Sequence, residues 1–188
     1  GLRMAADWAR FRKALCRLLG ADESSRSLRC VERLVAEPSA TVKGELQVSV
    51  GQWSRVLLWF GPLDAGFLGR VEAVLRCGWF HGLCDSATAF KLLDKLPDGS
   101  FLVRFSEASE PRAGVFTLSR KTKDQVVHQR FPHFPGQGVK FANVMYPDML
   151  KFVAAFEHDP NLSLKFPCPG SPYADLFPEL STTSIPVR

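Results

Sequence analysis

Long apolar runs, paired cysteines and nucleotide-binding motifs are all missing from this 188-residue sequence. Its longest apolar stretches are far too short to cross a bilayer. Residues 1–11 carry charge within a helical pattern and lack the apolar run of a secretory leader. The five cysteines are odd in number and include no C-x-x-C pair, which disfavours a disulfide framework and favours a reducing compartment. We therefore expect a protein of the cytoplasm or the nucleus.

Motifs of several enzyme classes are absent as well. The sequence has no P-loop, no kinase glycine-rich loop and no HRD-like catalytic segment. A D-x-D-x-D-G calcium loop is also missing. These absences predict that the 188 residues carry no catalytic chemistry and use no cofactor.

The composition is that of a mildly basic protein with a core. Apolar residues make up 46% of the chain and charged residues 23%, which is ordinary for globular domains. The length suits one large domain or two small ones. The net charge of +5 suits a phosphate-bearing partner. Charge alone does not identify that partner, because many solvated surfaces are equally basic.

Helical spacing dominates residues 1–77. Apolar residues recur there every three or four positions in several segments, with Asp7 placed to cap the first helix and Gly20 to end it. The predicted helices span about 8–19, 24–36, 51–60 and 67–75. Residues 46–50 alternate in polarity, which predicts a short strand or extended segment. We expect residues 1–77 to form an all-helical module that packs against the second half of the chain.

From residue 78 the pattern changes to strands flanked by helices. Residues 97–99, Pro-Asp-Gly, are a strong turn signal. The predicted helices span 86–96 and 148–156, and the predicted strands span 100–105, 114–120 and 125–131. This order predicts an α+β unit, an antiparallel sheet flanked by two helices. We expect this domain to occupy residues 78–178 and a mobile tail to occupy residues 179–188.

Arg104 is a cation in the middle of an otherwise apolar strand, F-L-V-R-F-S over residues 101–106. Alternation places Leu102, Arg104 and Ser106 on one face of the strand and the phenylalanines on the other. An arginine in such a strand is rarely buried unless it is paired. An internal salt bridge is the plain explanation, and ligand binding is the functional one.

Further donors are predicted close to Arg104. Ser106 and Ser109 lie in a loop whose hydroxyl and backbone N–H groups are suited to form an anion-binding nest. His128 and Arg130 share one face of a later strand. Two arginines, a histidine and such a loop suit a dianionic phosphate, because a guanidinium makes paired hydrogen bonds to phosphate oxygens.

Three segments together resemble a Src-homology-2 domain: W-F-H-G at 79–82, G-S-F-L-V-R-F-S at 99–106 and V-H-Q-R at 127–130. The resemblance covers about residues 78–177 and implies a phosphotyrosine-binding module of signalling proteins. It assigns the phosphate contact to Arg104 and a place against the phosphotyrosine ring to Arg130. It places the remaining pocket residues at Ser106, Glu107, Ala108, Ser109 and His128.

One position departs from the pattern of this family. Many members carry an arginine near the start of the first helix that also reaches the phosphate, and Ser86 stands there in this chain. Phosphate binding would then depend more on Arg104 and Arg130. The segment before the domain is similar to the helical linkers of STAT proteins and to the corresponding module of Cbl proteins. Residues 164–173 are similar to the ending of protist members.

The chain has two tyrosines, Tyr146 and Tyr173. In STAT proteins a phosphorylated tyrosine after the domain docks into a partner's pocket and forms a two-fold dimer. The apolar neighbours of Tyr173 favour a packing role instead, so we expect a monomer.

Other functions fit parts of the sequence. Cys77, His81, Cys84 and Cys168 offer soft metal ligands, but not at a standard zinc spacing. No motif of a cysteine hydrolase surrounds any of the cysteines. Nucleic-acid binding by a basic sheet is the main alternative, although the aromatic residues fall at core-facing positions. The expected partners are tyrosine-phosphorylated proteins or peptides, and neither a membrane nor a metal is expected.

Overall fold

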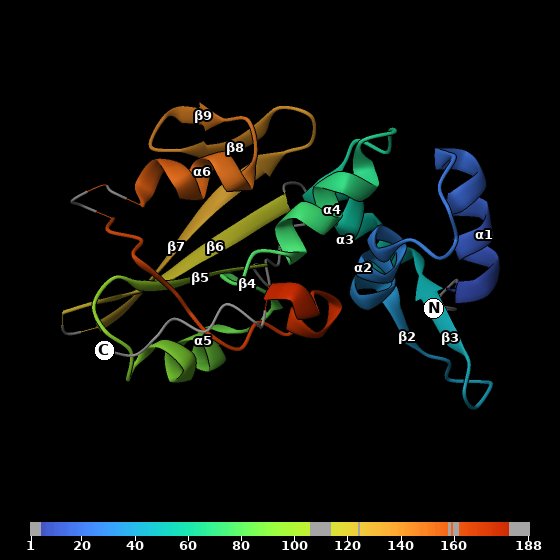
Figure 1. Ribbon diagram of the computed structural model, residues 1–188, viewed down its shortest axis with the longest axis horizontal. Coiled ribbons are helices and arrows are strands. Elements are labelled where there is room, and N and C mark those ends of the chain that lie inside the picture. The colour runs from blue at the N-terminus through green and yellow to red at the C-terminus, as the bar shows by residue number, and fades with distance from the viewer. Residues whose placement is uncertain (1–4, 106–113, 124, 158, 160–161, 181–188) are drawn as a thin grey trace. The chain divides into compact units, whose positions relative to one another are not determined.

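The computed structural model describes residues 5–105, 114–123, 125–157, 159 and 162–180 (Figure 1). The chain divides after Ala73 into two compact units. Among the described residues, no helix is long and apolar enough to cross a membrane.

The first unit contains the four predicted helices. They are α1 (Trp8–Leu19), α2 (Arg26–Val35), α3 (Val50–Phe60) and α4 (Phe67–Leu75), of which α4 continues past the division between the units. Side-chain caps explain where three of these helices begin. Asp7 caps α1, Ser25 caps α2, and Ser49 forms a capping box with Gln52 at the start of α3.

The prediction that this module is all-helical is wrong. A three-stranded antiparallel sheet of order β1-β3-β2 accompanies the helices. Its strands are β1 (Ala5–Asp7), β2 (Ala36–Pro38) and β3 (Leu46–Ser49). The alternating stretch at 46–49 is its central strand. The outer strands are three residues long and adjoin helix ends, so neither has room for a period-two pattern.

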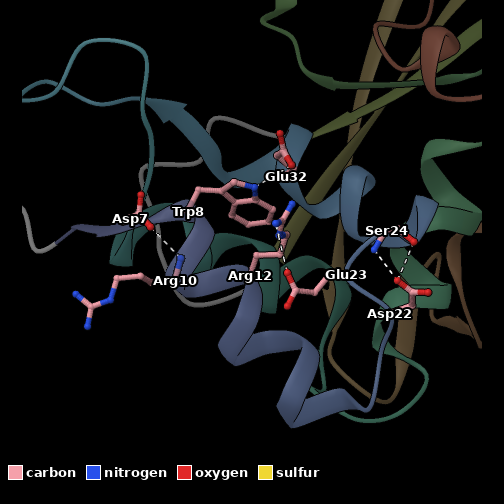
Figure 2. Close-up of polar contacts among 8 residues, drawn as sticks. All are labelled: Asp7, Trp8, Arg10, Arg12, Asp22, Glu23, Ser24 and Glu32. Carbon is pink, nitrogen blue, oxygen red and sulfur yellow. Dashed lines mark hydrogen bonds and ion pairs between the residues drawn. The ribbon is translucent and has the colours of Figure 1, made fainter.

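Polar contacts connect α1 to the neighbouring parts of the first unit (Figure 2). The Asp7 carboxylate accepts a hydrogen bond of 2.9 Å from the backbone N–H three residues later. Trp8, which is buried, donates its indole N–H to Glu32 of α2 at 2.8 Å. Arg12 and Glu23 form an ion pair at 3.3 Å. These contacts tie the first helix to the second one and to the turn between them.

The second unit is built on a mixed sheet of order β10-β5-β6-β7-β8-β9, with β4 also paired to β5. Strands β5 to β9 are antiparallel neighbours, whereas β4 and β10 run parallel to β5 along its outer edge. The strands are β4 (Phe80–Leu83), β5 (Ser100–Phe105), β6 (Gly114–Thr122), β7 (Gln125–Phe134), β8 (Gly138–Phe141), β9 (Val144–Tyr146) and β10 (Phe166–Pro167).

Helices α5 (Ser86–Leu93) and α6 (Met149–Phe156) cover opposite faces of this sheet (Figure 1). The predicted α+β fold with two flanking helices is confirmed; the sheet is antiparallel from β5 to β9, and it is parallel where β4 and β10 join β5. After β10 the chain forms two short 3-10 turns, η1 (Ala174–Leu176) and η2 (Pro178–Leu180). Residues 181–188, most of the predicted tail, lie outside the described residues.

The two faces of β5 pack as its alternation predicts. On the α6 face, Phe105 packs on Phe116, Phe116 on Phe131, and Phe131 on Phe152, with ring centroids 5.6, 6.1 and 4.7 Å apart. Full burial of each such side chain contributes roughly 1.5–3 kcal/mol to folding. On the α5 face, Leu102 joins a smaller apolar cluster with residues of that helix. Arg104 shares this second face.

Candidate functional site

Cross-strand pairing brings the predicted cations onto one face of the second sheet. Arg104 pairs with Thr117 of β6, and Thr117 pairs with Arg130 of β7. In the next row along the sheet, Ser119 pairs with His128. Paired residues in antiparallel strands point to the same face, and neighbouring strands lie about 4.8 Å apart. The backbone of Arg130 is therefore about 10 Å from that of Arg104.

Arg104 is held by hydrogen bonds from three different nitrogens. Its side chain is buried, at 4% exposure. Nη1 donates to the carbonyl oxygen of Cys84 and Nη2 to the hydroxyl of Ser86, both at 2.8 Å. Nε donates to the hydroxyl of Ser119 at 3.3 Å. All of these acceptors are neutral oxygens, and they fix the plane of the guanidinium.

Ser119 connects Arg104 to His128. Its hydroxyl lies 2.9 Å from Nδ1 of His128 and also accepts from Arg104. Partial burial, and then the positive charge of Arg104, lower the pKa of His128 below its ordinary value of 6.5. A neutral His128 can accept the Ser119 proton at Nδ1, which gives a relay of hydrogen bonds from Arg104 through Ser119 to His128.

The start of helix α5 forms the neighbouring wall of the site. Asp85 caps the helix by accepting a hydrogen bond from the backbone N–H of Thr88 at 2.6 Å, and this bond is the main cause of the lowered pKa of Asp85. Ser86 is the first residue of the helix and holds Arg104 directly. The hydroxyl of Ser86 therefore helps to orient the arginine of β5.

Two further donors lie at the exposed side of this arrangement. His128 and Arg130 are both exposed on β7, whereas Arg104 is buried on β5. A phosphate is a dianion with three acceptor oxygens, and buried or partly buried cations bind it more strongly than cations in bulk solvent. The arrangement therefore suits an anion bound on this face of the sheet.

Four of the predicted pocket residues lie outside the described residues: Ser106, Glu107, Ala108 and Ser109. Cross-strand pairing places Arg104, His128 and Arg130 on one face of the sheet. Sequence reasoning missed two groups that hold Arg104, the hydroxyl of Ser119 and the carbonyl of Cys84. Ser119 could have been found as a polar residue at an inward position of its strand. The carbonyl has no signature in the sequence.

The residues of the zinc alternative have other contacts. Nε2 of His81 lies 3.1 Å from the carbonyl oxygen of Cys168, and burial lowers the pKa of His81. Burial raises the pKa of the Cys77 and Cys168 thiols to about 11. Such thiols are poor nucleophiles at neutral pH, because the thiolate is the reactive form. Among the described residues, no group of three or more potential ligands is placed to hold a metal ion.

Comparison with known proteins places a family in the second unit. The SH2 domain family matches residues 79–153, which run from the residue before β4 into α6. The dual specificity protein kinases shkC and shkA of Dictyostelium discoideum are 31% and 27% identical over 166 and 154 residues. These matches cover 78% and 80% of this chain but only 32% and 28% of the kinases. The chain thus spans about a third of these relatives.

Other relatives are similar over about half of the chain. Suppressor of cytokine signaling 7 of Mus musculus is 29% identical over 97 residues, which is 52% of this chain and 16% of that protein. The solved SH2 domain of a Monosiga brevicollis CRK/CRKL homolog is 26% identical and aligns with a TM-score of 0.44 over 50% of this chain and 88% of that chain. The family match runs from the residue before β4 through α5 and β5 to β9 and into α6, so the chain contains an SH2 domain, a signalling module of the family that binds phosphotyrosine peptides.

Proposed function

We propose that this chain recognises tyrosine-phosphorylated proteins through a pocket centred on Arg104. The observation that carries the proposal is the arrangement of that guanidinium. It is buried on β5, is fixed by the Cys84 carbonyl and the Ser86 and Ser119 hydroxyls, and shares its face of the sheet with Arg130. A planar fork fixed in this way is preorganised to make paired hydrogen bonds to two phosphate oxygens.

Each predicted pocket residue has a role in this proposal. Arg104 binds the phosphate, and the loop formed by Ser106, Glu107, Ala108 and Ser109 surrounds the remaining oxygens. His128 borders the phosphate from the neighbouring row of the sheet. Arg130 lies against the ring of the phosphotyrosine and contributes a cation–π contact. A phosphoserine is too short to bring its phosphate to Arg104 while its backbone stays outside Arg130, which supports selectivity for phosphotyrosine.

The proposed role is recognition without catalysis. SH2 domains are binding modules, and we propose that these 188 residues have no enzyme activity and require no cofactor. The kinase activity named for the Dictyostelium relatives belongs to proteins about three times longer than the stretch matched here. We further propose a monomer that acts in the cytoplasm, or also in the nucleus, without binding a membrane.

The first unit is proposed to be a linker-like module that accompanies the SH2 domain. The second unit, Val74–Arg188, makes up about 61% of the chain (115 of 188 residues). The matches to the two Dictyostelium kinases cover 78% and 80% of the chain, so they must include part of the first unit. We propose that residues 1–77 and the SH2 domain at 78–178 are kept together as one functional segment.

A peptide library screen tests the proposed function. The purified chain is presented with matched libraries that contain phosphotyrosine, phosphoserine or unmodified tyrosine at the fixed position. We expect binding to the phosphotyrosine set alone. The Arg104→Met variant should lose it, and Lys140→Met, which removes an exposed cation elsewhere on the sheet, should keep it. Equal binding to the phosphoserine set would contradict the proposal.

Filter binding of single-stranded RNA at two salt concentrations tests the nucleic-acid alternative. Backbone contacts to nucleic acid weaken steeply as salt rises. Phe105, Phe116 and Phe131 of the sheet pack against one another in the core, which leaves them unsuited to stack on bases. We expect no RNA binding at physiological salt. Tight RNA binding without phosphopeptide binding would replace the proposed function with the alternative.

A further inference from the structure

The segment after α6 runs along the same edge of β5 as β4. Strand β10 pairs with Ser100 and Phe101 at the start of β5, and β4 pairs with Val103 and Phe105 further along. The backbone N–H of Cys168, directly after β10, donates to the Phe101 carbonyl at 2.8 Å. The two segments therefore follow one another on one edge, and the chain after β10 continues toward β4.

Residues 168–173 contact three successive residues of β4. The hydroxyl of Ser171 donates to the carbonyl of Phe80 at 2.8 Å, and the His81 ring lies within hydrogen-bond distance of the Cys168 carbonyl. The Tyr173 ring stacks on the Phe80 ring, with centroids 5.7 Å apart and planes 17° from parallel. Tyr173 is only 6% exposed. These contacts cover the part of β4 that leads into the site.

The Tyr173 hydroxyl lies directly against the backbone of Gly82. A Cβ atom added to Gly82 would lie 1.8 Å from that oxygen, which is far inside any tolerated contact. Gly82 also has φ of +57°, in the left-handed region that side chains disfavour. The register between β4 and β5 shifts between Phe80 and Leu83, so the regular ladder does not fix Gly82. The contact with Tyr173 supplies a constraint at the point where the ladder is interrupted.

The position of Gly82 affects the phosphate pocket because only a few residues separate Gly82 from two of the groups that hold Arg104. Cys84, two residues after Gly82, accepts from Nη1 of Arg104, and Ser86, four residues after Gly82, accepts from Nη2. Hydrogen bonds weaken steeply when their length or angle changes. We infer that Tyr173 is a positioning residue: its hydroxyl fixes Gly82, and thereby sets the carbonyl and hydroxyl that orient the Arg104 guanidinium. This inference rests on the proposed function of Arg104.

Substitution of the two tyrosines tests the inference with a built-in control. Tyr173→Phe keeps the ring that stacks on Phe80 and removes only the hydroxyl. Tyr146→Phe is the matched control, because Tyr146 packs on Phe152 and Phe156 of α6, on the other face of the sheet. We expect Tyr173→Phe to weaken phosphotyrosyl-peptide binding about three- to tenfold, as for one weakened hydrogen bond. Tyr146→Phe should bind as wild type does.

A second measurement does not need a ligand. The side-chain Nε–H signal of Arg104 is followed by ¹H–¹⁵N NMR in the unliganded protein, with Arg104→Lys to assign it. We expect Tyr173→Phe and Gly82→Ala to move this signal and Tyr146→Phe to leave it unchanged. An unchanged Arg104 signal and wild-type affinity in Tyr173→Phe would overturn the inference. A shifted Arg104 signal in a protein that binds no phosphopeptide would leave the positioning role standing and refute the proposed function instead.

Discussion

Replacing Arg104 by lysine or methionine should abolish phosphotyrosine binding while the protein stays folded. Lysine keeps the charge but offers one nitrogen, whereas Arg104 uses three nitrogens at 2.8, 2.8 and 3.3 Å to hold its plane. Without this fork, the paired bonds to two phosphate oxygens cannot form. Truncating one partner of a buried charged pair costs roughly 2–5 kcal/mol. That corresponds to an affinity loss of about 30-fold to several thousand-fold.

The folded state should tolerate the loss of this cation. Arg104→Met leaves the Cys84 carbonyl and the hydroxyls of Ser86 and Ser119 without one donor each, at about 1 kcal/mol apiece. Ser86 is exposed, so water can replace the lost donor. Methionine also removes the desolvation penalty of a buried charge, which amounts to several kcal/mol per ion. We therefore expect the melting temperature of Arg104→Met to be unchanged or raised.

Isothermal titration calorimetry with a phosphotyrosyl peptide checks the predicted loss of binding, and thermal melts check the predicted stability. If Arg104→Lys binds the peptide with wild-type affinity, Arg104 does not bind the phosphate. If Arg104→Met unfolds the protein, the arginine has a structural role instead of a phosphate-binding one.

Three further predictions concern neighbouring residues. Arg130→Ala should weaken binding of a phosphotyrosyl peptide about 5- to 30-fold and of inorganic phosphate much less, because a cation–π contact contributes roughly 1–2 kcal/mol; equal losses in calorimetry would remove its contact with the ring. Because the pKa of His128 is lowered in the folded protein, the unfolded chain is protonated first as pH falls through 6.5. The stability of the wild-type protein should therefore fall as the pH is lowered from about 7.5 to the folded-state pKa of His128, and it should fall less steeply in His128→Gln. Identical melting curves for the two proteins across this pH range would refute the prediction. Treatment with a promiscuous tyrosine kinase should leave the chain monomeric by light scattering, since Tyr173 is 6% exposed and stacked on Phe80. A phosphate-dependent dimer lost in both Tyr173→Phe and Arg104→Met would establish the reciprocal exchange.

Helices and strands with a clear periodic pattern could be predicted from the sequence. Short strands and turns without such a pattern could not. The helices and the strands β5, β6 and β7 have apolar residues at regular spacing. Strand β4 consists of four residues with a glycine, and its register to β5 is interrupted. The β8–β9 hairpin turns at Ala142 and Asn143, both at positive φ. Alanine rarely takes that conformation, so the usual Asn-Gly signal of such a turn is missing.

The side chains of the site could be predicted from the alternation along each strand. The backbone atoms that take part in the site could not be predicted from the sequence. Arg104, His128 and Arg130 were identifiable because a period of two places them on one face. The environment of Arg104 depends on the Cys84 carbonyl and on β4, which reaches β5 only through parallel pairing. The contact between Tyr173 and Gly82 joins positions 91 residues apart, and no local pattern indicates it.

Titration of the wild-type protein with a phosphotyrosyl peptide from the library screen, followed at the Arg104 Nε–H signal, tests the central claim most directly. We predict that this signal shifts and saturates in step with binding, and that the unphosphorylated peptide leaves it in place. A phosphopeptide that binds while the Arg104 signal stays unchanged would contradict the assignment of Arg104 as the phosphate-binding residue.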